Sequence, residues 1–79
     1  MSAPAHAFFL FHTSSHAFRA ERVLGRAGLP CRLVPVPRQL SSDCGVCLRV
    51  EPAVREAVAA LLAGERVEVA AVSLVALSP

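Results

Sequence analysis

The order of six short segments along this chain constrains its fold more than any other feature. Two segments repeat apolar residues at helical spacing, one before Gly28 and one between Pro52 and Gly64. Four others are short apolar runs of strand length: Ala7–His12, Cys31–Val36, Val46–Val50 and Val67–Val72. The pattern therefore predicts the order strand, helix, strand, strand, helix, strand.

The ends of both helices carry recognisable signals. Thr13, Ser14 and Ser15 precede the first helix, and any of them can cap it by accepting a hydrogen bond from a free amide. Glycines are expected to stop both helices, Gly28 the first and Gly64 the second. Pro52 suits the first turn of the second helix, where a missing N–H has no cost.

This order is that of the α+β, ferredoxin-like split β-α-β-β-α-β fold, a four-stranded antiparallel sheet with two helices on one face. We expect a single domain spanning residues 1–79, with its core at about residues 7–72 and residues 73–79 unplaced. In this topology the turn-rich loop Arg38–Gly45 lies at the same end of the sheet as the start of the first helix. Cys31 falls at the opposite end.

Composition narrows the function classes. The chain is 54% hydrophobic and 18% charged, and it has no apolar run of the length that a membrane span or a secretory signal needs. A net charge of +2 is too small to indicate a nucleic-acid-binding surface. Three cysteines, an odd number, favour free thiols in a reducing cytoplasm. We expect a cytoplasmic protein without a cofactor, small enough that a homo-oligomer would help to bury its surface.

The segment most capable of carrying out chemistry is the loop around Cys44. A thiolate is favoured near positive charge or a helix N-terminus. The topology brings both near the loop: the helix start at Ser14, and Arg38 or Arg49, which flank the loop. Gly45 can turn backbone amides toward an anionic sulfur. Asp43 works against this, because a neighbouring negative charge raises a thiol pKa. Cys44 is therefore a candidate working thiol, and an unreactive loop cysteine is the alternative.

Other residues near this loop allow further interpretations of its chemistry. The spacing of Cys44 and Cys47 permits a disulfide, but Cys47 lies in an apolar strand, which favours a buried structural residue. A zinc site would need His12 and His16 as the remaining ligands, on the weak signal of one CxxC motif. Those histidines are otherwise polar residues flanking the helix start, or proton donors to the Cys44 sulfur. Cys31 is expected to be a small apolar filler.

Taken together, these motifs resemble a small bacterial family described as selenium/sulfur carrier protein-like. The residues that carry the likeness are His12–His16, Ala20-Glu21, Gly28-Leu29-Pro30, Pro35-Val36-Pro37-Arg38, Ser41-Ser42-Asp43-Cys44-Gly45 and Leu48-Arg49. The resemblance covers about residues 8–72 and implies that Cys44 holds sulfur or selenium as a persulfide-type adduct. A donor enzyme and an acceptor protein are then the implied partners, and the role is closer to a carrier than to a turnover enzyme. Cys47 as a second working thiol is not implied by the family.

A function of a different class remains open beside the carrier. Ferredoxin-like folds also serve as interaction or regulatory domains without catalysis, and a fold does not by itself specify a function. On that interpretation the cysteines are incidental, and the start of the first helix binds an anion or a partner protein.

Overall fold

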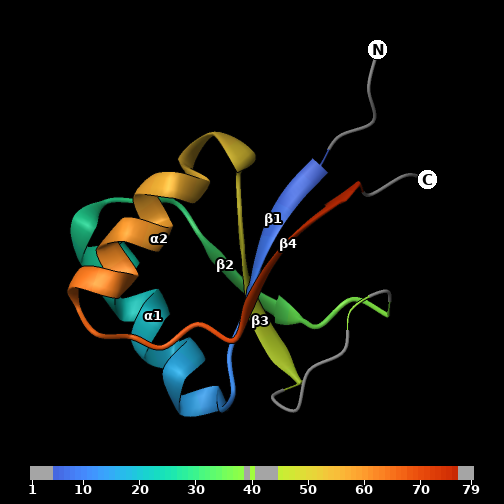
Figure 1. Ribbon diagram of the computed structural model, residues 1–79, viewed down its shortest axis with the longest axis horizontal. Coiled ribbons are helices and arrows are strands. Elements are labelled where there is room, and N and C mark those ends of the chain that lie inside the picture. The colour runs from blue at the N-terminus through green and yellow to red at the C-terminus, as the bar shows by residue number, and fades with distance from the viewer. Residues whose placement is uncertain (1–4, 39, 41–44, 77–79) are drawn as a thin grey trace.

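A computed structural model describes residues 5–38, 40 and 45–76 of the chain. The chain runs β1 (Ala5–Leu10), α1 (Ser14–Ala27), β2 (Arg32–Pro35), β3 (Val46–Val50), a 3-10 turn η1 (Pro52–Val54), α2 (Arg55–Gly64) and β4 (Ala71–Ala76). The strands form one sheet in the order β2-β3-β1-β4, and every neighbouring pair is antiparallel. Both helices lie on the same side of this sheet (Figure 1). The predicted ferredoxin-like α+β fold is confirmed.

The main core lies between the helices and the sheet. Phe9 of β1 stands opposite Leu48 of β3, and both are fully buried against the helices. From α1 the buried residues are Ala17, Ala20, Val23 and Leu24, and from α2 they are Val58 and Leu62. All six belong to the predicted apolar stripes, whereas Ala27 and Ala57, which fit the same helical spacing, are exposed.

A second, smaller cluster covers part of the other face of the sheet. Phe8, Leu10 and Cys47 are buried there, because alternate residues of a strand point to opposite faces. Val36 and Leu40, which follow β2, pack against this cluster. The open face of the sheet therefore has an apolar cover at the end where β1 finishes and β3 begins.

The last strand lies later in the chain than the sequence predicted. We expected Val67–Val72, whereas β4 is Ala71–Ala76 and takes in part of the segment left unplaced. The reason is the way α2 ends: the amide of Val67 donates to the carbonyl of Leu62 at 2.9 Å, and Val67 is buried. Val67 is the hydrophobic residue that closes a Schellman motif, so the strand begins only after the chain has left the helix.

The glycine predicted to stop α2 is also not the residue that turns the chain. Gly64 is the last residue of the helix, and the left-handed position two residues later is occupied by Arg66 at φ 59°. At the end of α1 the prediction holds, since Gly28 has φ 76° and its amide donates to the carbonyl of Gly25. The two helices thus end in the same motif, once with glycine and once without.

Candidate functional site

The start of β3, which follows the predicted site around Cys44 in the chain, lies at the end of the sheet where β1 passes into α1. Leu10, the last residue of β1, stands opposite Cys47 of β3, and Cys47 stands opposite Val34 of β2. The amide of Ala70, just before β4, donates to the carbonyl of Leu10 at 2.7 Å. The start of β3 therefore lies at the same end of the sheet as the start of α1, as the topology required.

Thr13 caps the N-terminus of α1. Its backbone is extended, and its Oγ1 accepts a hydrogen bond from the amide of His16 at 3.3 Å. Ser14 is the first residue of the helix, and its side chain is exposed. Of the three candidate caps, the structure therefore selects Thr13. No acidic residue lies in the first turn of α1, so no carboxylate of that turn competes for its positive end.

The two histidines predicted near the site flank this cap. His12 is exposed, just before Thr13, and His16 is half-buried within the first turn. Nδ1 of His16 is buried and has no hydrogen-bond partner in the part of the chain that the structure describes. Across the same residues, no group of three or more His, Cys, Asp or Glu side chains is arranged to hold a metal ion.

The segment that follows β2 is tied to the start of β3. The amide of Val36 donates to the carbonyl of Gly45 at 3.2 Å, and the amide of Leu40 donates to the carbonyl of Pro37 at 3.0 Å. Gly45 has φ 79°, a left-handed conformation in which a side chain would be strained, although a Cβ there would meet nothing within 4 Å. The requirement for glycine at this position is therefore conformational.

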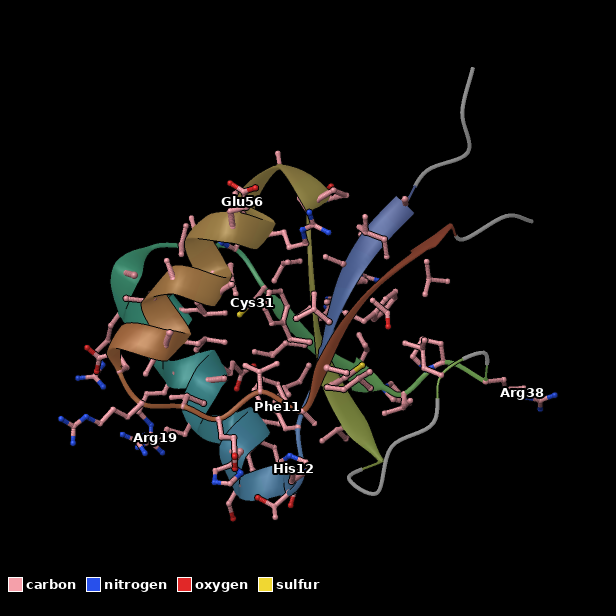
Figure 2. The ribbon with its side chains drawn as sticks, viewed as in Figure 1. Phe11, His12, Arg19, Cys31, Arg38 and Glu56 are labelled. Carbon is pink, nitrogen blue, oxygen red and sulfur yellow. The ribbon has the colours of Figure 1, made fainter. Side chains whose placement is uncertain are left out.

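Arg38 does not converge with the start of α1. Its side chain is exposed and extends away from the body of the molecule at the right of the view, whereas His12 lies beside the start of α1 near the lower centre (Figure 2). The predicted group of supporting residues thus divides in two: Ser14, His12 and His16 at the helix start, and Arg38 with Gly45 on the β2–β3 connection.

Cys44 itself lies outside the described residues, as do Ser41, Ser42 and Asp43. Its role therefore stays a prediction, and so does the distance between its sulfur and the groups expected to support a thiolate. What the structure does give is the position of its neighbour Gly45, exposed at the entry to β3.

The other two cysteines are in different surroundings. Cys47 is fully buried in the cluster on the open face of the sheet. Cys31 is half-buried, packs against the main core and lies on the helix side of the sheet (Figure 2). Burial, and secondarily the negative charge of Glu21, raises the pKa of the Cys31 thiol above 9.0. At neutral pH Cys31 is therefore a protonated, weakly reactive thiol, in keeping with an apolar filler.

Sequence reasoning missed the apolar cluster on the open face. Its signal was the unbroken run Phe8–Phe11, since a strand buried on only one face alternates apolar and polar residues. That cluster determines the surroundings of Cys47, which the spacing to Cys44 alone did not reveal.

Comparisons with known proteins bear on the family. No match was found among curated proteins or among solved structures. In the described part of the chain, no helix has the length and apolar character that crossing a membrane requires. One family model matches residues 6–73, which include both helices and most of the four strands. The chain belongs to the family described as "Putative Se/S carrier protein-like".

Proposed function

We propose that this protein carries a sulfur or selenium atom on Cys44, as a persulfide-type adduct, and passes it from a donor enzyme to an acceptor protein. The observation that carries the proposal is membership of the Se/S carrier-like family over residues 6–73, a range that includes Cys44. The fold supports it, because Gly45 and the capped start of α1 lie at one end of the sheet.

The chemistry needs no net oxidation or reduction. The Cys44 thiolate attacks the outer sulfur of a persulfide on the donor, forming a new S–S bond while the donor's own S–S bond breaks. The donor leaves as a thiolate, and Cys44 holds the transferred sulfur. Attack by an acceptor thiolate on that outer sulfur reverses the process and restores Cys44. The protein's contribution is to keep Cys44 ionised and accessible.

The two halves of the supporting group contribute unequally. The amides at the start of α1 carry a partial positive charge with no carboxylate in the first turn to neutralise it. Arg38 is exposed, and water and salt screen its effect on a thiolate. We therefore assign the larger part of any thiolate stabilisation to the helix and to the backbone around Gly45.

Cys47 has a different place in the proposal. Because it is fully buried, a donor protein cannot reach it directly, so loading is assigned to Cys44. Cys47 can act only from within, by attacking the Cys44 sulfur of the adduct, forming a Cys44–Cys47 disulfide and releasing hydrogen sulfide. A thiol reductant would then have to reduce that disulfide before the next cycle.

Intact mass spectrometry tests the loading step. The reduced protein is exposed briefly to glutathione persulfide, and the parent protein is compared with Cys44→Ser and Cys31→Ser. We expect one added sulfur on the parent and on Cys31→Ser, and none on Cys44→Ser. Equal loading of the parent and Cys44→Ser would overturn the proposal.

A non-catalytic interaction domain is the second candidate, and one observation favours it. Val72 and Leu74 of the edge strand β4 are 42% and 53% exposed, and exposed apolar residues on an edge strand are typical of pairing surfaces. Such a domain would keep its partner binding after all three cysteines were replaced, whereas a carrier would lose sulfur transfer.

A cytoplasmic location fits the carrier, because free thiols persist in a reducing compartment.

A further inference from the structure

Two arginines stand directly opposite each other on neighbouring strands. Arg32 of β2 pairs with Arg49 of β3, while the next pair, Leu33 and Leu48, points into the main core. Since side chains alternate between faces, both arginines project toward the open face of the sheet. Like charges directly opposite each other destabilise a strand pair, so this arrangement calls for a compensating charge.

No carboxylate of the described residues is paired with either arginine. Neither guanidinium forms a hydrogen bond or an ion pair among these residues. Nε2 of His6 lies 3.8 Å from Oε1 of Glu51. Arg32 is exposed, but Arg49 is only half-exposed. Within the described residues, a partly desolvated cation thus lies beside a second one, and neither is paired.

Both arginines help to line a pocket at the end of the sheet where β3 finishes. It has a volume of about 210 Å³, and its walls include His6, Cys31, Arg32, Arg49 and Glu51. This is smaller than the roughly 300–1,000 Å³ of pockets that hold drug-sized ligands. Its dimensions favour a small ion over a nucleotide or a larger metabolite.

The charge around the pocket favours an anion. Two guanidinium groups face one carboxylate, that of Glu51, whose side chain is 66% exposed and therefore well hydrated. Glu21 lies close enough to affect Cys31, but it is not part of the pocket wall. The raised pKa of Cys31 keeps its thiol neutral at pH 7, so it adds no negative charge.

We propose that this pocket binds a small inorganic oxyanion, such as phosphate or sulfate, bridged between Arg32 and Arg49. Guanidinium groups present paired N–H donors that match the spacing of two oxyanion oxygens. A doubly charged oxyanion between the two guanidinium groups would attract both and so offset their mutual repulsion. The pocket lies at the opposite end of the sheet from the start of α1, so the inference is independent of the role of Cys44.

Binding is measured by titrating inorganic phosphate, and separately sulfate, into the ¹⁵N-labelled protein at constant ionic strength and following amide chemical shifts. The chain has no Trp or Tyr, which makes NMR a better probe than intrinsic fluorescence. We expect saturable shifts at Arg32, Arg49 and His6. Arg49→Gln should weaken binding at least about tenfold, the effect of losing a charge-assisted hydrogen bond.

Two further variants make the experiment decisive. Arg32→Gln, on the exposed edge strand, tests the same site with less risk to folding and should weaken binding to a similar extent. Arg22→Gln removes an equal charge from the exposed surface of α1 and should leave binding unchanged. Shifts that do not saturate, or that weaken equally in all three variants, would show a general salt effect and overturn the proposal.

Discussion

Replacing Arg66 by glycine should stabilise this protein. Arg66 has φ 59°, the left-handed conformation, at the point where α2 ends. The amides of Arg66 and Val67 donate to the carbonyls of Ala63 and Leu62 at 3.1 and 2.9 Å, so the position is fixed by a Schellman motif. Because Arg66 is exposed, removing its side chain loses little packing, and conformational strain dominates the effect.

The magnitude follows from two opposing terms. A non-glycine residue in the left-handed region costs roughly 1–2 kcal/mol, which Arg66→Gly removes. Glycine in turn adds roughly 0.4–1 kcal/mol of conformational freedom to the unfolded chain. The net gain in the free energy of unfolding is about 0.5–1 kcal/mol. For a chain of this size that gain raises Tm by roughly 2–8 °C.

Thermal unfolding followed by far-ultraviolet circular dichroism is the assay. Gly28→Ala is the matched control, because Gly28 occupies the same place in α1 at φ 76° and a Cβ there would meet nothing within 4 Å. Its Tm should fall by a similar amount. An Arg66→Gly variant with an unchanged or lower Tm would refute the reasoning, and with it the explanation of why β4 begins later than the sequence predicted.

Three further predictions test the site and the core. Thr13→Ala should lower the free energy of unfolding by about 1 kcal/mol, because Thr13 caps α1, whereas Ser14→Ala should change it by less than about 0.5 kcal/mol; urea unfolding distinguishes them, and a larger effect at Ser14 would contradict the cap. Alkylation of Cys31 by iodoacetamide in Cys44→Ser protein should stay slow up to pH 9, because burial and then Glu21 raise its pKa. The thiol of Cys31 ionises at lower pH in the unfolded chain than in the folded one. The stability that Cys31 contributes is therefore complete below about pH 9 and is lost as pH rises through the folded pKa. Glu21→Gln should shift both the onset of alkylation and this loss of stability to lower pH, and the absence of a shift would remove Glu21 as a cause. Phe9→Ala removes a fully buried side chain and should cost roughly 3–5 kcal/mol, enough to leave the chain largely unfolded by circular dichroism; a cooperative transition near the parent Tm would contradict the placement of the core.

The sequence was sufficient for the order and faces of the elements. β3 was predicted as Val46–Val50 and has those bounds, because polar, turn-forming residues precede it and Pro52 follows. β4 was misplaced because Val67 looks like the start of an apolar strand but is buried by closing the end of α2. The spacing of apolar residues cannot tell whether Val67 begins a strand or closes the end of a helix. What distinguishes the two is the hydrogen bond from the amide of Val67 to the carbonyl of Leu62.

The candidate site was less predictable for a similar reason. Spacing alone suggested that Cys44 and Cys47 act as a pair, but whether Cys47 is accessible depends on which face of β3 it occupies. That face follows from the pairing of Cys47 with Leu10 and from Val36 packing over it, both of which are contacts distant in the chain. The sequence offered three possible caps for α1, and the extended backbone of Thr13 together with the hydrogen bond from the amide of His16 distinguished it.

The central claim, that Cys44 holds the transferred atom, is tested most directly with a protein in which Cys44 is the one remaining cysteine. Cys31→Ser/Cys47→Ala protein is incubated with glutathione persulfide, desalted and weighed intact, then mixed with a reduced acceptor thiol and weighed again. We predict one added sulfur after loading and its loss after mixing, with Cys44→Ser gaining none. Absence of an adduct on the single-cysteine protein, once circular dichroism shows that it is folded, would contradict the carrier account.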